Sequence, residues 1–136
     1  MADRLEVLAA HLDAENRHDL AAIMATYVAE PVVVINGVAV RGRAGVERFH
    51  ARFGFGGAGS FADVRVDERA RHVTADAIAI EQTLSGHHVG DWDGLAPTQR
   101  RYSIPVCTVY RFAPSGLLES EDVYFDRAGI RAQLAG

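Results

Sequence analysis

Residues 81–126 read EQTLSGHHVGDWDGLAPTQRRYSIPVCTVYRFAPSGLLESEDVYFD. In and around this stretch, apolar side chains recur at every second position, which is the period of a strand that buries one face. Three segments show the pattern, at 77–85, 101–112 and 117–125. A turn rich in Gly, His and Trp separates the first two. We therefore expect a run of antiparallel strands in the second half of the chain.

The predicted strands place a few neutral polar groups among apolar side chains. Gln82 falls on the apolar face of the first strand, and Thr108 and Tyr110 fall on that of the second. An apolar hollow with a few convergent hydrogen-bonding groups is typical of a small-molecule site. The orientation of the last strand stays open, and no carboxylate falls clearly on an inner face.

The first half of the chain is expected to be mainly helical. Leucines at three- and four-residue spacing indicate the first helix, and Pro31 is expected to stop the second. Asn36-Gly37 is a strong hairpin signal, although a turn one or two residues later would leave Asn36 inside a strand. The expected elements are helices at 3–15, 20–29 and 44–53, a hairpin at 32–40, a loop at 54–60 and a strand at 61–68. The fold class is therefore α+β.

The composition of the chain argues against several classes of function. The 136 residues are expected to form a single domain, 1–136, whose net charge of −4 argues against a nucleic-acid partner. No apolar run is long enough to span a membrane, and no signal peptide is predicted. All 14 basic side chains are Arg, which excludes lysine nucleophiles. The single Cys107 suggests a reducing compartment, so a cytoplasmic location is expected.

Several motifs resemble the SnoaL-like branch of the nuclear-transport-factor-2-like, or cystatin-like cone, superfamily. The pattern is Gly-x-His-x-Gly, then Gly-x-x-Pro-Thr-x-Arg, then a closing Asp followed seven residues on by Gln-Leu. The motif residues here are Gly86–Gly90, Gly94–Arg101, Tyr110–Phe112, Tyr124–Asp126 and Gln133-Leu134. The resemblance implies a curved antiparallel sheet forming a cone, three helices of the N-terminal half covering an apolar pocket, and a homodimer.

The resemblance also allows the catalytic sets of the superfamily to be compared with this chain. Asn36 sits where ketosteroid isomerases place a carboxylate base, and Thr108 where they place a protonated acid. His11 matches the oxyanion-binding Tyr of those enzymes by approximate register. Val123 replaces the catalytic Asp of the polyketide cyclases and of limonene-epoxide hydrolase, and Leu84 replaces a second Asp of that hydrolase. None of the three known sets is intact.

Two residues are candidate catalytic groups. His11 is an acid/base candidate because an imidazole titrates near neutral pH, and Glu121 could supply the missing inward carboxylate. The alternatives are a surface histidine and a solvated strand-end glutamate. Asn36 is either a pocket group or simply part of a turn. The candidate ligand-binding residues are Val34, Asn36, Gln82, Trp92, Val106, Thr108, Tyr110 and Val123.

The turn after the first strand has two readings. His87, His88, Asp91 and Asp93 are residue types that ligate zinc or iron, but they could equally decorate a turn at the mouth of the pocket. We expect no metal and no cofactor. Asp126 is expected to cap a short C-terminal helix.

The leading functional hypothesis is a polyketide- or terpenoid-type cyclase or isomerase that acts on an apolar oxygenated metabolite. The alternative is a non-catalytic module that binds a hydrophobic ligand or forms a dimeric interaction surface. Whether the chain is an enzyme is left open by the sequence.

Overall fold

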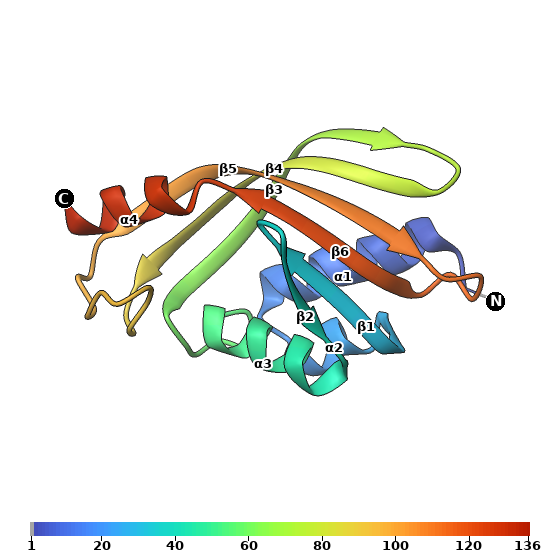
Figure 1. Cartoon of the computed structure of the whole chain (residues 1–136), viewed down its shortest axis with the longest axis horizontal. Helices are drawn as coiled ribbons and strands as arrows, with labels where there is room; N and C mark the ends of the chain where they lie inside the picture. The colour runs from blue at the N-terminus through green and yellow to red at the C-terminus, as the bar shows by residue number, and fades with distance from the viewer. Residues whose placement is uncertain (1) are drawn as a thin grey trace.

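The structure is a computed structural model that describes residues 2–136. The elements are α1 (Arg4–Arg17), α2 (Leu20–Met24), β1 (Tyr27–Ile35), β2 (Val38–Arg41), α3 (Arg43–Phe53), β3 (Phe61–Val73), β4 (Ala77–His88), β5 (Arg101–Phe112), β6 (Leu118–Phe125) and α4 (Arg127–Ala135). Helices α1, α2 and α3 come before β3, and β4, β5, β6 and α4 follow it, as Figure 1 shows by colour along the chain. The predicted α+β class is confirmed, with four helices beside one sheet.

The six strands form one sheet in the order β2-β1-β6-β5-β4-β3. The sequence predicts antiparallel pairing throughout, but β1 pairs with β6 in parallel. This happens because the chain crosses from β2 to the far edge through α3 and returns strand by strand, so β6 arrives beside β1 in the same direction. Two irregularities in the β3–β4 register, between Ala62 and Arg65 and between Glu68 and Ala70, favour bending of the long strands.

The bent sheet covers the helices of the N-terminal half, which lie along its concave side (Figure 1). The core between them is made of apolar side chains from both layers, including Leu8 on α1, Val46 on α3 and Ile80 on β4, all fully buried. The chain ends lie at opposite ends of the long axis of the molecule (Figure 1). The helices and the concave face therefore enclose the interior in which a site can form.

Helix boundaries follow their capping residues. The side chain of Asp3 accepts a hydrogen bond from the backbone N–H of Leu5 at the start of α1, and His18 ends the helix in the left-handed conformation, with φ 58°. Asp19 caps α2 in the same way. Asp126 caps α4 through the N–H of Gly129, as the sequence predicts.

The second helix is shorter than predicted. It ends at Met24, and the segment that follows enters β1 at Tyr27, so Pro31 lies inside a strand and does not stop a helix. The register between β1 and β6 shifts between Tyr27 and Val32, around this proline. Proline has no N–H to donate to the neighbouring strand. It is tolerated at such an irregularity because the ladder of hydrogen bonds is already interrupted there.

Candidate functional site

A cavity of about 530 Å³ lies between the concave face of the sheet and helix α3. Aromatic and aliphatic side chains make most of its wall. Most of its polar side chains fall into three groups: an ionisable cluster, a neutral hydrogen-bonded row and a set of arginines. The lining residues are Glu15, Ile35, Val38, Val40, Gly45, Arg48, Phe49, His50, Arg52, Phe53, Phe55, Ser60, Val66, Gln82, Leu84, Trp92, Val106, Thr108, Tyr110, Glu121, Val123, Phe125 and Arg127.

The ionisable cluster centres on His11, which has no exposed surface. The Nε2 atom of His11 lies 2.7 Å from Oε1 of Glu121 and 3.5 Å from Oε2 of Glu15. These are ion-pair distances, yet the ring N–H is aligned on neither carboxylate well enough to count as a hydrogen bond. His11 therefore lies between two buried carboxylates. Glu15 and Glu121 line the cavity, and His11 lies behind them because it is not part of the wall.

One helix and one strand bring these three groups together. His11 and Glu15 are four residues apart on α1, so they share one face of the helix. Glu121 comes from β6, on the concave face that also carries Val123 and Phe125. The sequence placed no carboxylate clearly on an inner face, and in the structure Glu121 is the carboxylate of β6 that lies there. The structure settles the orientation of β6 in favour of the parity that holds Glu121.

The orientation of the His11 ring is fixed by Thr26. The Thr26 hydroxyl donates to the carbonyl oxygen of Ile23 at 2.6 Å, which uses its only proton. The Nδ1 atom of His11 lies 2.9 Å from the same hydroxyl oxygen, so Nδ1 must be the donor in that contact. Nδ1–H is thereby assigned, and Nε2 is the atom that faces Glu121 and Glu15.

Burial and charge act in opposite directions on His11. Burial alone would lower the pKa of His11, but the carboxylates of Glu121 and Glu15 outweigh it and raise the pKa to about 10. Burial alone would likewise raise the pKa of Glu121, but the His11 cation, helped by His50 and by a hydrogen bond from Tyr27, holds it below its usual range. The pair is therefore ionised at neutral pH.

Glu121 and Glu15 differ in their partners. Oε1 of Glu121 accepts a hydrogen bond of 2.6 Å from the buried hydroxyl of Tyr27. The carboxylate of Glu15 accepts no hydrogen bond within residues 2–136, although Nε2 of His50 lies 3.9 Å from its Oε2. His50 itself is oriented by its Nδ1, which donates to the Val46 carbonyl at 2.8 Å. Glu15 is thus the carboxylate whose oxygens remain available to a molecule in the cavity.

The neutral row lies on β4 and β5, where the sequence predicts it. The Thr108 hydroxyl donates to Oε1 of Gln82 at 3.2 Å, and Nε2 of Gln82 donates to the Tyr110 hydroxyl oxygen at 3.2 Å. Because Tyr110 accepts in this row, its own proton is not used within it. Burial, with Glu15 and Glu121 nearby, raises the pKa of Tyr110 well above its usual value, so the hydroxyl stays protonated and can donate.

Six of the eight predicted ligand-binding residues line the cavity, and two do not. The exceptions are Val34 and Asn36. Val33 is fully buried and Ile35 lines the cavity, so residues 34 and 36, which alternate with them along the chain, face away from it. Asn36 occupies the turn between β1 and β2 with φ 48°. Its amide bridges the backbone N–H and C=O of Phe125, so the turn interpretation of Asn36 is correct and the pocket interpretation is wrong.

The sequence reasoning missed Glu15, Tyr27 and His50. A usable signal exists for two of them. Glu15 follows His11 by four residues, and His50 follows the apolar Val46 by four, so each shares a helix face with a residue that the structure buries. Tyr27 gave no such signal, because it was assigned to a helix that ends before it.

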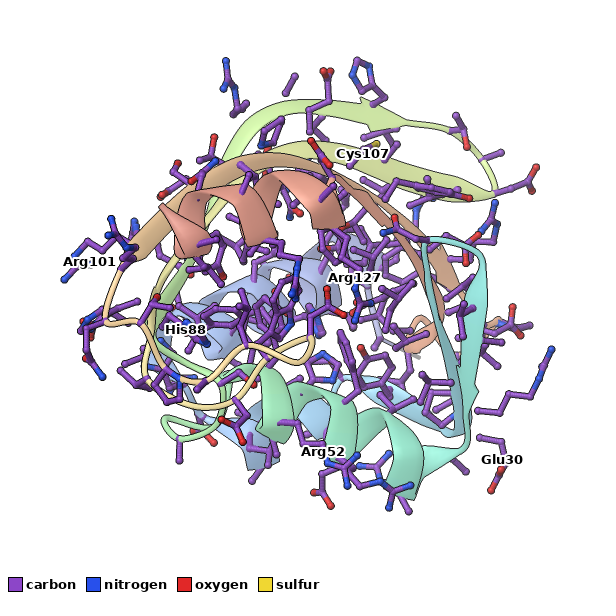
Figure 2. All side chains as sticks on the ribbon, turned by 60° about the vertical axis from the view of Figure 1, so that its left-hand side comes forward. Glu30, Arg52, His88, Arg101, Cys107 and Arg127 are labelled. Carbon is purple, nitrogen blue, oxygen red and sulfur yellow. The ribbon has the colours of Figure 1, made fainter. Side chains whose placement is uncertain are left out.

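The predicted turn residues lie apart from the cluster. His88 is fully buried at the end of β4, where its Nδ1 accepts a hydrogen bond of 3.1 Å from the backbone N–H of Thr98. His87 is half-buried and contacts the carbonyl of Gln99. Asp93 accepts from Arg127 at 2.9 Å, which lowers the pKa of that carboxyl. The contacts of His87 and His88 hold the turn, and Asp93 holds Arg127. Figure 2 labels His88 and Arg127.

One group of side chains in residues 2–136 has a composition that could hold a metal ion. Ligand atoms of His11, Glu15 and His50 lie within 4.8 Å of one another. However, Nε2 of His11 is also within ion-pair distance of Glu121, 2.7 Å from its Oε1, and a protonated His11 has no nitrogen lone pair to give to a metal ion. With His11 protonated, the group is a buried ion-pair cluster.

The family follows from a comparison with known proteins. The family model described as SnoaL-like polyketide cyclase matches residues 5–134, almost the whole chain. The chain belongs to the SnoaL-like polyketide cyclase family. A comparison with curated proteins finds no match. None of the helices within residues 2–136 is long and apolar enough to cross a membrane.

Solved structures with the same fold are named for several different activities. A candidate polyketide cyclase from Pseudomonas putida is 20% identical, with a TM-score of 0.85 and coverage of 98% of both chains. AclR, a candidate hydroxylase from Streptomyces galilaeus, is 21% identical, with a TM-score of 0.81 and coverage of 97% of this chain and 95% of its own. SalBIII, an epoxide hydrolase/cyclase-like enzyme of pyran ring formation in the polyether salinomycin, is 16% identical, with a TM-score of 0.76 and coverage of 93% and 92%. At these identities the likeness shows the fold, which hosts more than one reaction.

Proposed function

We propose that this SnoaL-like protein is an enzyme that closes or isomerises a polyketide- or terpenoid-type metabolite by proton transfer in its cavity. The observation that carries the proposal is the carboxylate of Glu15. It is buried and lines the cavity, and its oxygens accept no hydrogen bond within residues 2–136. A carboxylate placed in this way can remove a proton from a carbon next to a carbonyl group.

Tyr110 supplies the complementary group. When a base removes such a proton, negative charge develops on the carbonyl oxygen, and a hydrogen-bond donor already in place stabilises that charge. The Tyr110 hydroxyl accepts from Gln82 and has its own proton free to donate. Gln82 and Thr108 hold this hydroxyl in place. In the proposed step, Glu15 takes the proton, Tyr110 donates to the oxygen, and the proton returns from Glu15 to another atom of the same substrate, so nothing is consumed.

His11 and Glu121 have supporting roles in this proposal. Glu121 is already engaged by Tyr27 and by the His11 cation, which makes it the weaker base of the two carboxylates. His11 stays protonated and offsets the charge of Glu15 and Glu121 in a dry environment. We propose that the pair sets the charge around Glu15, while Val123, in place of the catalytic Asp of related enzymes, contributes only to the apolar wall.

The test is turnover of a simple probe, an apolar β,γ-unsaturated ketone whose conjugated isomer absorbs in the ultraviolet. Binding is followed separately through the fluorescence of Trp92, the single tryptophan, which lines the cavity. We expect the protein to accelerate the isomerisation and Glu15→Gln to lower the rate by about two to four orders of magnitude. Arg69→Gln, an exposed change on β3, is the matched control.

A bound probe that is released unchanged by the wild-type protein would contradict the enzyme proposal and favour the second candidate, a hydrophobic-ligand binder. That candidate draws support from the mainly apolar wall around the polar groups. We also propose a homodimer, to be checked by analytical ultracentrifugation, and a cytoplasmic location, consistent with the single Cys107.

A further inference from the structure

The mouth of the cavity carries two arginines on one face of α3. Arg48 and Arg52 are four residues apart, so their side chains leave the helix in nearly the same direction. Both line the cavity together with Phe49 and Phe53 from the same helix. Both are nevertheless exposed, so their aliphatic stems follow the aromatic wall while their guanidinium groups reach solvent.

These two guanidinium groups have no partner. Within residues 2–136, neither Arg48 nor Arg52 forms a side-chain hydrogen bond or an ion pair. Arg127, which lines the same cavity from α4, is different: it is held by Asp93 and lies over the ring of Trp92 at 5.3 Å. Figure 2 shows Arg127 and Arg52 on the two helices that face each other across this space. One arginine of the wall is therefore fixed, and the two on α3 are free to bind.

The charge of the cavity changes sign from one end to the other. Glu15 and Glu121 stand at the closed end, where they repel an anion, and the free arginines stand at the mouth. The protein as a whole is acidic, with a net charge of −4, so this cationic rim is a local feature. A molecule with an apolar body and one anionic group would enter body first and leave its charge at the rim.

The guanidinium group also limits the chemistry of the ligand. Its planar fork of N–H donors matches the two oxygens of a carboxylate or a phosphate, and two such forks side by side can hold one anion from both sides. We propose that Arg48 and Arg52 form a subsite for a carboxylate or phosphate group of the substrate. This inference rests on the proposed function, because it assumes that the apolar cavity holds the rest of the molecule.

Three probes with the same ten-carbon tail test the subsite: decanoate, decyl phosphate and decanol, each titrated below its micelle concentration and followed by Trp92 fluorescence. We expect at least one anion to bind about tenfold more tightly than decanol, as a charge-assisted hydrogen bond implies. Its affinity should fall as salt is added, whereas that of decanol should not. The tighter of the two anions identifies the natural head group as a carboxylate or a phosphate.

The variant Arg48→Gln/Arg52→Gln should remove the preference for the anion and leave decanol binding unchanged. Arg69→Gln, which changes the net charge by one without touching the cavity, should keep the preference. Equal binding of all three probes to the wild-type protein, or an unchanged preference in the double variant, overturns the subsite while leaving the proposed proton transfer intact. Failure of all three probes to bind overturns the proposed function together with the subsite.

Discussion

The closed end and the mouth of the cavity both hold charged groups, but under opposite conditions. At the closed end, the buried Glu121 accepts a hydrogen bond of 2.6 Å from the buried Tyr27 and lies within ion-pair distance of the buried His11, at 2.7 Å. At the mouth, Arg48 and Arg52 are exposed and unpaired within residues 2–136. We infer from this difference that the buried groups of the closed end are fixed by the fold and contribute to its stability. The exposed arginines of the mouth contribute little to stability and are available to a ligand.

The largest expected effect comes from breaking the closed end. His11→Ala leaves the carboxylates of Glu15 and Glu121 buried without their cation, and removing one partner of a buried ion pair costs about 3–5 kcal/mol. Urea unfolding of the purified variant measures the loss. Arg17→Ala, which breaks the exposed pairs with Asp13 and Asp19, is the control and should cost far less. Similar losses in both variants would remove the distinction between buried and exposed pairs.

A smaller effect is expected from Thr26, which holds the His11 ring. Thr26→Val removes the acceptor for Nδ1–H and leaves that group buried without a partner, which costs about 1–3 kcal/mol. Thr26→Ser keeps the hydroxyl and should retain most of the stability. Urea unfolding distinguishes the two variants. A loss in Thr26→Ser equal to that in Thr26→Val would mean that the methyl group matters and the hydroxyl does not.

Stability should also depend on pH through the same ion pair. The pKa of His11 is raised on folding, so its contribution is complete below the unfolded value of about 6.5 and is lost as the pH rises toward the folded value of about 10. The pKa of Glu121 is lowered, so its contribution is present above about 4.5 and is lost as the pH falls. Thermal unfolding from neutral to alkaline pH should show the alkaline loss, and His11→Ala should flatten it. An equally steep profile in the variant would assign the loss to other groups.

The smallest effect on stability is expected at the mouth. Arg48→Gln and Arg52→Gln remove no hydrogen bond or ion pair within residues 2–136, so each should change the free energy of unfolding by less than about 0.5 kcal/mol. Urea unfolding checks this, alongside Arg127→Gln, which loses its contacts with Asp93 and Trp92 and should cost more. A clear loss in Arg48→Gln or Arg52→Gln would show that these side chains already have partners.

Alternation in the sequence predicted the parts of the site that lie in long strands. Gln82, Thr108 and Tyr110 were placed on the right faces because β4 and β5 run without interruption through them. Alternation failed at Val34 and Asn36, because nothing in the short apolar run of the hairpin shows which alternate residues face inward. An error of one residue then moves every side chain to the other face.

The acid–base cluster could not be predicted from the alternation of the strands, because it depends on tertiary contacts. Glu15 and His50 are polar residues on helices, where a surface position is the usual expectation. Only the packing of α1 against β3 and β6, and of α3 against β1 and β2, shows that both side chains turn inward. The parallel pairing of β1 with β6 was equally hidden, because a parallel pair joins segments that are far apart in sequence.

The central claim is that His11 is a buried cation between Glu15 and Glu121, and ¹⁵N NMR of the imidazole tests it most directly. At a pH of about 8, where a free histidine is neutral, we predict that both ring nitrogens of His11 carry protons. The half-buried His18, whose Nε2 donates to the Val64 carbonyl at 2.7 Å, provides an internal comparison in the same spectrum. A neutral His11 ring at that pH, with one unprotonated nitrogen, would contradict the account.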